Sequence, residues 1–174
     1  MPLPRDHLQI LLVGSAGREH AFAWKLCQSP LVEAVFVVPG NGGTDHSLPK
    51  VANVNGVSAK NFDDRLEVAK TSKINFVVPS AEEPLVGSFV YKFQQAGVCC
   101  FGPSEAAARL EGSKAFAKAF MNRHGIPTAR HRAFDSFTEA KEYLYAAEGP
   151  VVIKASGLAA RKGVLMPTSI EEAV

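Results

Sequence analysis

The part of the chain before Pro103 alternates short apolar runs with longer amphipathic stretches, and no other feature constrains the fold as strongly. Buried strands are predicted at residues 8–13, 34–38, 74–78 and 98–101. Helices are predicted between them, at residues 18–28, 63–71 and 85–96. Strand, helix and strand at this spacing indicate an α/β fold. Its sheet is parallel, is covered by helices on both faces and has right-handed crossovers.

The pattern changes after Pro103, and we expect a domain boundary there, with residues 1–103 in one domain and residues 104–174 in a second. The second part is predicted to hold helices at 105–110, 113–124 and 138–147, strands at 129–134, 151–154 and 163–166, and a last helix after Ser169. The last strand is expected to pair with its predecessor through the glycine-containing loop between them.

Composition excludes several classes of protein. Apolar residues make up 47% of the chain and charged residues 21%, an ordinary globular mixture. A net charge of +2 is too balanced for a protein that coats nucleic acid, although a local basic site is compatible with it. No apolar stretch approaches the roughly 18 residues of a membrane span, and the N-terminus has no signal-peptide pattern. We therefore expect a soluble, cytosolic protein without nucleic-acid or membrane partners.

The cysteines are Cys27, Cys99 and Cys100, an odd number without a C-x-x-C motif. This pattern argues against a disulfide framework and against a zinc site. Buried free thiols in a reducing compartment are the better interpretation.

Three segments with glycine, proline or acidic residues follow three different predicted strands. They begin at Gly14, Gly40 and Pro79. Ligands of parallel α/β sheets bind at the carboxyl ends of the strands, so we expect these segments to converge in space.

The first segment, Gly14-Ser-Ala-Gly17, lies between a strand and a helix. Backbone N–H groups and the positive end of a helix favour an anion there, typically a phosphate, and Arg18 could add a charge-assisted bond. G-x-G-x-x-G is absent because positions 16 and 19 are Ala and Glu, so an NAD-type site is disfavoured. A plain glycine turn is the alternative, and His20 taken alone is more often a packed helix residue.

The other two segments are ambiguous on their own. Gly40-Asn-Gly-Gly43 allows positive φ and a close backbone approach to a ligand, but a flexible turn explains it equally well. Glu82 and Glu83 could bind sugar hydroxyls or an amine, and a solvated acidic loop is the alternative.

Basic residues of the second part suggest a polyphosphate site. Lys114 stands near a helix start, where a cation is unfavourable unless an anion sits beside it. Lys154 ends a strand, and Lys162 lies in a glycine-containing loop. One fixed and one mobile cation suit a polyphosphate with a loop folding over it, although no Walker A motif is present. A surface hairpin with incidental lysines is the alternative.

Five stretches together resemble the glycinamide ribonucleotide synthetase (phosphoribosylamine–glycine ligase) family, in the family's order and spacing. The run from Phe101 to Ala129 is the most specific. The stretches are LLVGSAGREHAFAWKL, VVPGNGGT, EEPLV, CCFGPSEAAARLEGSKAFAKAFMNRHGIPTA and VVIKASGLAARKGV.

This resemblance implies a Rossmann-like (pre-ATP-grasp) domain that binds phosphoribosylamine, followed by the beginning of an ATP-grasp domain. It implies ATP-dependent ligation of glycine to 5-phospho-D-ribosylamine through a glycyl phosphate, giving glycinamide ribonucleotide, ADP and phosphate in purine (IMP) biosynthesis. In animals and fungi such a chain is usually the first part of a multifunctional purine-synthesis protein, so fused activities are possible.

The resemblance also assigns residues to two sites. Those for the sugar phosphate are Gly14, Gly17, Arg18, Glu19 and His20, flanked by Asn41, Gly42, Gly43 and Thr44, with Glu82 and Pro84 opposite. Those for ATP are Lys114, Lys154, Gly157, Leu158, Ala159, Ala160, Arg161, Lys162, Gly163 and Val164. The ligands of Mg²⁺ are expected in a C-terminal part beyond this chain, and none within it.

The sequence departs from the family's pattern at three places. Ala16 and Arg161 stand where glycine is usual, and Ser80-Ala81 replaces glycine and proline. If the Arg161 position requires positive φ, arginine costs on the order of 1 kcal/mol there.

The family's chain continues for more than this length again, so we expect a truncated enzyme that is inactive alone. A non-catalytic short form that binds phosphoribosyl compounds or a partner chain is the alternative. A nucleotide-dependent oxidoreductase is disfavoured, because its glycine motif is broken and no acidic residue follows the second predicted strand.

Overall fold

The computed structural model describes residues 7–45, 47–57, 61–80, 88–159 and 163–174. It divides into two compact units, Met1–Ala108 and Arg109–Val174. Each unit is described by itself.

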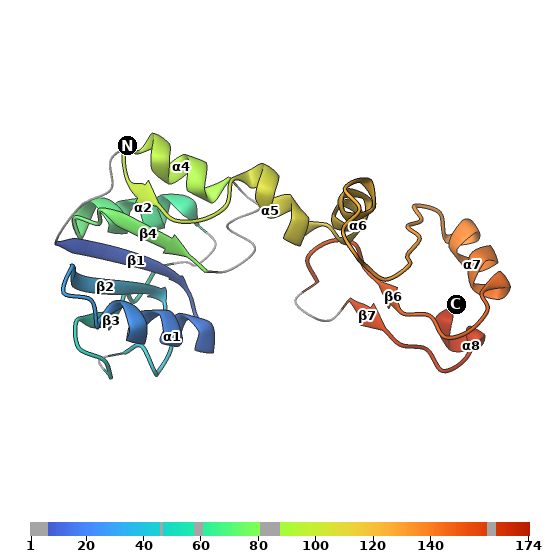
Figure 1. The fold of residues 1–174 in the computed structure, drawn as a ribbon. Coiled ribbons are helices and arrows are strands. Elements are labelled where there is room, and N and C mark those ends of the chain that lie inside the picture. The colour runs from blue at the N-terminus through green and yellow to red at the C-terminus, as the bar shows by residue number, and fades with distance from the viewer. Residues whose placement is uncertain (1–6, 46, 58–60, 81–87, 160–162) are drawn as a thin grey trace. The chain divides into compact units, whose positions relative to one another are not determined.

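A five-stranded sheet in the order β3-β2-β1-β4-β5 forms the centre of the first unit (Figure 1). All its strand pairs are parallel, which confirms the predicted sheet. The strands are β1 (Leu8–Gly14), β2 (Val32–Pro39), β3 (Val51–Asn53), β4 (Phe76–Pro79) and β5 (Cys99–Cys100). The helices are α1 (Gly17–Leu26), α2 (Phe62–Thr71) and α4 (Phe89–Gln95).

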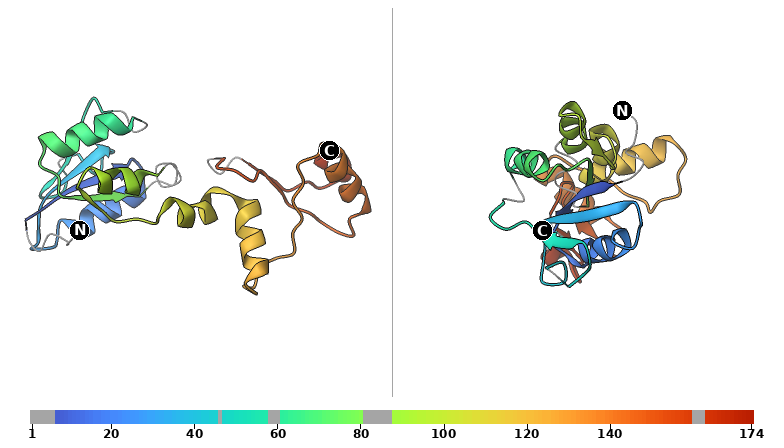
Figure 2. Two further views of the ribbon diagram at one scale, coloured as in Figure 1. Left: turned by 90° about the horizontal axis from the view of Figure 1, so that it is seen from above. Right: turned by 90° about the vertical axis from the view of Figure 1, so that its left-hand side faces the viewer.

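Helices cover both faces of this sheet, as predicted (Figures 1 and 2). On one face, Leu12 of β1 packs in a cluster with Ala23 of α1. On the other face, Leu11 belongs to a cluster with Val68 of α2 and Phe93 of α4. Alternate residues of β1 therefore serve opposite layers, as the period of a strand requires.

Strand β3 was not predicted, because three residues are too short to show a periodic pattern. The helix predicted at 85–96 is confirmed over Phe89–Gln95, and residues 85–87 lie outside the described ranges. Gly97 ends it with φ +78°, as a C-terminal glycine should.

The cysteines agree with the interpretation as thiols. Cys27 and Cys99 are buried, Cys100 is half-buried, and none of the three forms a disulfide. Burial, with a contribution from Cys99, raises the pKa of Cys100 to about 12, which keeps its thiol protonated and unreactive.

The second unit begins within α5 (Glu105–Gly112), which spans the boundary between the units in the sequence. Its elements are α6 (Lys114–Arg123), α7 (Phe137–Ala146), β6 (Ile153–Lys154), β7 (Val164–Leu165) and α8 (Ile170–Ala173). Strands β6 and β7 pair antiparallel, as predicted. The side chains of Ser113, Ser136 and Ser169 cap α6, α7 and α8 by accepting backbone N–H bonds.

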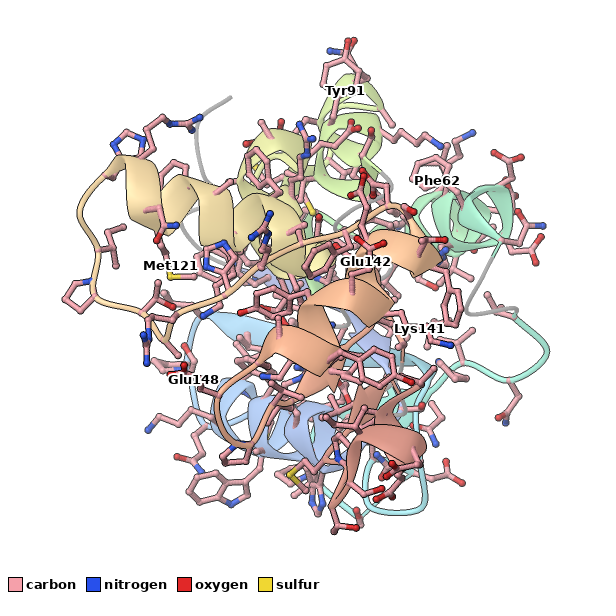
Figure 3. All side chains as sticks on the ribbon, turned by 90° about the vertical axis from the view of Figure 1, so that its right-hand side faces the viewer. Phe62, Tyr91, Met121, Lys141, Glu142 and Glu148 are labelled. Carbon is pink, nitrogen blue, oxygen red and sulfur yellow. The ribbon has the colours of Figure 1, made fainter. Side chains whose placement is uncertain are left out.

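The second unit has no fully buried residue among those that the structure describes. Lys141 and Glu142 extend from α7 in Figure 3, and the Lys141 Nζ lies 6.0 Å from the ring centroid of Phe137, which is 69% exposed. The helices of this unit therefore pack with their apolar faces only partly covered.

The strand predicted at 129–134 is wrong. These residues form no strand, and the Lys118 Nζ instead donates to Thr128 Oγ1 (2.7 Å) and to the Ala129 carbonyl (3.0 Å). The Lys118 ammonium thus bonds a backbone carbonyl that a neighbouring strand would bond in a sheet. Within the described ranges, no helix has the length and apolar character needed to cross a membrane.

Candidate functional site

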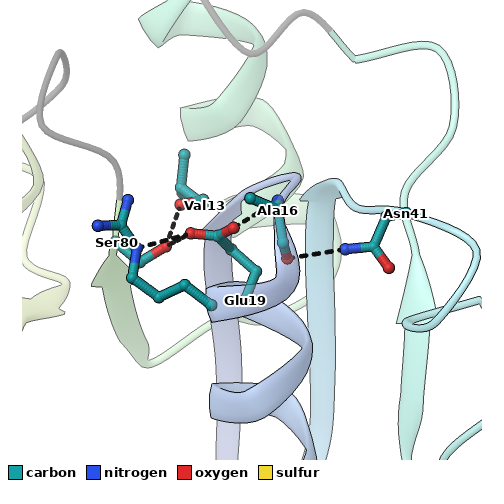
Figure 4. A network of polar contacts seen from close by, with 6 residues as sticks. Val13, Ala16, Glu19, Asn41 and Ser80 are labelled. Atoms are coloured by element: carbon teal, nitrogen blue, oxygen red, sulfur yellow. Dashed lines mark hydrogen bonds and ion pairs between the residues drawn. The ribbon is translucent and has the colours of Figure 1, made fainter. Parts of the chain in front are cut away.

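A buried carboxylate organises the carboxyl edge of the sheet (Figure 4). Glu19, in the first turn of α1, is only 1% exposed. Its Oε2 accepts a bond from the Ala16 N–H (2.5 Å) and its Oε1 accepts from the Arg18 Nε (3.3 Å). The Ser80 hydroxyl, just after β4, lies within hydrogen-bond distance of both Glu19 Oε1 and the Val13 carbonyl. Glu19 therefore ties the turn after β1 to the end of β4.

The pKa of Glu19 reflects these bonds. Burial alone would raise it, but the bonds from Ser80, Ala16 and Arg18 outweigh burial and hold the pKa below its ordinary value of 4.5. Glu19 is therefore a carboxylate at neutral pH, and it places a negative charge where the α1 dipole favours one.

Gly14 makes room for this carboxylate. Its φ is +148°, and an added Cβ would lie 2.5 Å from the Glu19 Cδ. Gly14 thus accommodates a side chain of the protein itself. At Gly17, by contrast, an added Cβ would meet nothing within 4 Å, and its N–H belongs to the first turn, which has no intrahelical acceptors. The open part of the turn is therefore at Gly17, and the Ala16 N–H is already used by Glu19.

The loop after β2 closes against the start of α1. Asn41 Oδ1 accepts from the Gly43 N–H (2.8 Å), and Asn41 Nδ2 donates to the Ala16 carbonyl (3.0 Å). Thr44, fully buried, accepts from the Asn41 N–H through its Oγ1 (2.9 Å). The predicted convergence of the segments after β1 and β2 is confirmed, and Ser80 brings the end of β4 to the same place.

His20 and Gly43 touch across this edge. An added Cβ on Gly43 would lie 2.5 Å from the His20 Nδ1, whereas one on Gly42 would meet nothing within 4 Å. Of the two glycines, only Gly43 has a neighbouring side chain that leaves no room for a Cβ. Residues Glu82 and Pro84, predicted opposite, lie outside the described ranges.

Two polar residues of this edge were missing from the predicted site. Ser80 belongs to the segment after Pro79 that was predicted to reach this edge, but only its departure from the family's glycine distinguishes it in the sequence, and the structure shows that it bonds Glu19. The sequence does not point to Asn53, because a strand as short as β3 cannot be predicted from it. Its Nδ2 donates to the Asn41 carbonyl (2.9 Å), and its Oδ1 accepts from Thr44 Oγ1 (2.7 Å). The one feature of the sequence that could have indicated Asn53 is its position, shortly after the glycine-rich segment 40–43.

The second unit brings the loop after β6 to the start of α6. The Lys114 N–H donates to the Ser156 carbonyl (2.8 Å), and the Ala115 N–H donates to Ser156 Oγ (3.1 Å). The Lys114 Nζ donates to the Gly157 carbonyl (3.2 Å). One backbone oxygen, that of Gly157, thus accepts a bond from the Lys114 ammonium at the positive end of a helix. The sequence had singled out Lys114 but not Ser156, which supplies two of these three acceptors.

The residues at the two ends of the loop that follows, Ala155 and Gly163, lie close together. The Ala155 N–H donates to the Gly163 carbonyl (2.8 Å), and an added Cβ on Gly163 would lie 2.6 Å from the Ala159 Cβ. Lys154 ends β6 and is exposed, and Leu158 and Val164 are about half exposed. The predicted positions Ala160, Arg161 and Lys162 lie outside the described ranges. Across the described ranges, no three His, Cys, Asp or Glu side chains gather as a metal site would require.

Comparison with known proteins gives matches over residues 8–174. The family model for the phosphoribosylglycinamide synthetase N domain matches residues 8–111, and that for the ATP-grasp (A) domain matches residues 112–174. The chain is 51% identical over 166 residues to the phosphoribosylamine–glycine ligase of Allochromatium vinosum, covering 95% of this chain and 38% of that protein. It is 47% identical over 165 residues to the bifunctional purine biosynthetic protein ADE1 of Schizosaccharomyces pombe, covering 94% and 21%.

Solved structures agree. The phosphoribosylamine–glycine ligase of Thermotoga maritima superposes with a TM-score of 0.69 at 32% identity, covering 94% of this chain and 37% of that one. The biotin carboxylase domain of the Hydrogenobacter thermophilus 2-oxoglutarate carboxylase superposes with a TM-score of 0.73 at 19% identity, covering 94% and 38%, which shows a common fold only. The chain therefore spans about two fifths of the length of its bacterial relatives.

Proposed function

The chain belongs to the phosphoribosylglycinamide synthetase family, and on this premise we propose that it is part of an enzyme that ligates glycine to 5-phospho-D-ribosylamine at the expense of ATP. The observation that carries the proposal is the meeting of the α1 turn and the loop after β2 at the carboxyl edge of the sheet, joined by the bond from Asn41 to Ala16.

We assign the sugar phosphate to this edge. Its phosphate would meet the open turn at Gly17 and the guanidinium of Arg18, which donates charge-assisted bonds. Glu19 orients Arg18 through their bond and is too buried to contact substrate. The residues assigned around the sugar are His20, Asn41, Gly42, Gly43 and Thr44, with Glu82 and Pro84 opposite.

We assign the phosphates of ATP to the second unit. Lys114 and Lys154 would supply charge, and the loop 157–164 would cover the triphosphate. The contacts of Ser156 and Gly157 with the start of α6 support this assignment, because they hold Lys114 and the base of that loop together. Phosphorylation of the glycine carboxylate would convert it into an acyl phosphate, whose phosphate leaves when the sugar amine attacks.

Mg²⁺ would neutralise charge on the phosphates of ATP in such a reaction. The described residues do not fit a metal centre, because they contain no cluster of ligating side chains. We propose that its ligands lie in the part of the family's chain that follows the residues matched here. We further propose that the protein is cytosolic, with domains 1–103 and 104–174, and that it acts on small molecules. Fusion to other purine-synthesis domains is a further part of this proposal.

Calorimetry with ribose 5-phosphate, in which a hydroxyl replaces the amine, tests the sugar-phosphate site. We expect the chain to bind it and Arg18→Ala to weaken binding about tenfold, the loss expected for a charge-assisted bond. Lys25→Ala, at the other end of α1, is the matched control and should bind as the wild type does. No binding by the wild type, or equal binding by both variants, would contradict the assignment.

The ligase activity is tested in a chain extended to the length of the bacterial relatives. We expect this chain to release ADP and phosphate in the presence of glycine, ATP, Mg²⁺ and phosphoribosylamine. Binding of ribose 5-phosphate without any turnover by the extended chain would instead support a non-catalytic form that binds phosphoribosyl compounds.

A further inference from the structure

We infer that Asn53, at the end of β3, is a positioning residue for the sugar-phosphate site, because it fixes the conformation of the loop after β2. The inference rests on the proposed function, since that loop is assigned to the substrate. Asn53 itself lies on β3, the edge strand of the sheet, and β2 separates β3 from β1 and the turn at Gly17.

The Asn53 amide bonds two residues of this loop, Asn41 and Thr44. Its Nδ2 donates to the main-chain carbonyl of Asn41 (2.9 Å), and its Oδ1 accepts from the hydroxyl of Thr44 (2.7 Å). Thr44 is fully buried, so its hydroxyl depends on protein partners for its hydrogen bonds. The donor and the acceptor of one side chain thus hold two residues of the loop in one arrangement.

Two oxygens lie within reach of the Thr44 hydroxyl proton, the Asn53 Oδ1 at 2.7 Å and the Asn41 carbonyl at 3.1 Å, and the shorter contact favours donation to Asn53. A hydroxyl has one proton to donate and lone pairs to accept. When Thr44 Oγ1 donates to Asn53, it can accept the Asn41 N–H (2.9 Å) at the same time. The Asn41 N–H and carbonyl are then both fixed, and the Asn41 side chain is held where its Nδ2 reaches the Ala16 carbonyl (3.0 Å).

Gly40 shows how closely the loop is fitted to Asn53. Its φ is +74°, and an added Cβ would lie 1.9 Å from the Asn53 Oδ1. The backbone at Gly40 therefore runs against the Asn53 amide, at a distance that only glycine allows. The contact is made by the loop that joins β2 to the proposed substrate residues.

Asn53→Asp tests this role with little change of shape. The aspartate keeps an acceptor for Thr44 but presents an oxygen to the Asn41 carbonyl, where Asn53 donated. A matched control exists at the opposite end of the same sheet. Asn75, just before β4, is also half-buried; its Oδ1 accepts from the Gln9 N–H (3.0 Å) and its Nδ2 donates to the His7 carbonyl (3.0 Å). Asn75→Asp therefore removes the same kind of bond far from the proposed site.

The experiment measures ribose 5-phosphate affinity, thermal unfolding and amide hydrogen exchange on the whole chain and both variants. We expect a smaller loss of thermal stability for Asn75→Asp, because the Nδ2 bond that it removes is exposed, whereas the Nδ2 bond of Asn53 is part-buried. Asn53→Asp alone should weaken binding about tenfold and speed exchange at the N–H groups of Asn41, Gly43 and Thr44. The reason is that the aspartate cannot donate to the Asn41 carbonyl, so the loop loses this restraint. Asn75→Asp should leave affinity and loop exchange unchanged.

The outcomes separate this inference from the proposed function. Equal affinities in the two variants, or unchanged loop exchange in Asn53→Asp, would overturn the positioning role. If the wild type does not bind ribose 5-phosphate, the proposed function fails. Loop exchange then still decides whether Asn53 fixes the loop, and a rise confined to Asn53→Asp supports it.

Discussion

The two units hold their proposed sites in different ways. In the first, a fully buried glutamate and a fully buried threonine bond the loops at the edge of a five-stranded sheet. In the second, the contacts between the start of α6 and the loop after β6 are exposed, and the strands beside them have two residues each. No residue described in that unit is fully buried.

This difference has energetic consequences. A polar group bonded inside a protein is costly to leave unsatisfied, whereas an exposed one can turn to water. Changes at the first site should therefore affect both the free energy of unfolding and ligand binding. Changes at the second site should affect binding with little effect on that free energy.

Two leucines give the most direct test of the contrast. Leu12 in β1 is 0% exposed and Leu165 in β7 is 41% exposed. We expect Leu12→Ala to lower the free energy of unfolding by about 3 kcal/mol, because it leaves a cavity in the core. Leu165→Ala should change it by about 0.5 kcal/mol or less. Urea denaturation measures both, and equal losses would show that the second unit has a core of comparable strength.

The buried carboxylate should have the next largest effect. Glu19→Gln removes the charge and one acceptor, and we expect a loss of about 2 kcal/mol of unfolding free energy near neutral pH. Because the pKa of Glu19 is lowered in the folded state, its contribution is present above about pH 4.5 and is lost as the pH falls through the folded-state value. Denaturation at several pH values should therefore give a flatter acid limb for the variant. An unchanged limb would contradict the role of Glu19.

Glu172 offers the matching carboxylate of the second unit. A bond from the Thr168 N–H, the larger cause, and one from the Thr168 hydroxyl lower its pKa. The sign of its pH dependence is therefore the same as for Glu19. The side chain is exposed at the start of α8, so Glu172→Gln should leave the acid limb of unfolding unaltered and serves as the control.

Much of this contrast could be predicted from the sequence, but not its polar details. The apolar runs of the first unit are long enough to give β1, β2 and β4, and parallel pairing then brings Gly14 and Gly40 to one edge. The contacts of single polar residues were harder to predict. Glu19 resembled a ligand contact in the motif, yet the fold buries it against Gly14.

Side-chain partners far apart in sequence explain what the sequence could not predict. Asn53 meets Thr44 only because β3 pairs with β2, and three residues are too few to predict that strand. Ser156 meets Ala115 across 41 positions, in a unit whose strands are too short to fix their neighbours from pattern alone. In both cases a polar residue acts through tertiary contacts that no local pattern encodes.

A neighbouring pair of glycines tests how tightly the first site is fitted. Gly43→Ala would place a methyl group 2.5 Å from the His20 Nδ1, so the ring or the loop must shift. We expect a loss of about 1 kcal/mol of unfolding free energy, as for modest overpacking, and weaker binding of ribose 5-phosphate. Gly42→Ala, whose added methyl group meets no protein atom within 4 Å, should leave the free energy of unfolding unchanged. Urea denaturation distinguishes the two variants, and equal free energies would mean that the loop accommodates a methyl group at either position.

The smallest effect is expected in the second unit, at Ser156. Ser156→Ala removes the acceptor of the Ala115 N–H but keeps the backbone carbonyl that accepts from Lys114. Because this contact is exposed, we expect a change of about 0.5 kcal/mol or less in unfolding free energy. Binding of ATP should weaken about threefold, since the base of the proposed phosphate loop would no longer be held to α6. Ser136→Ala, which removes the cap of α7, is the control for stability without an effect on ATP. A large loss of stability in Ser156→Ala would show that the second site, like the first, is built into the folding of its unit.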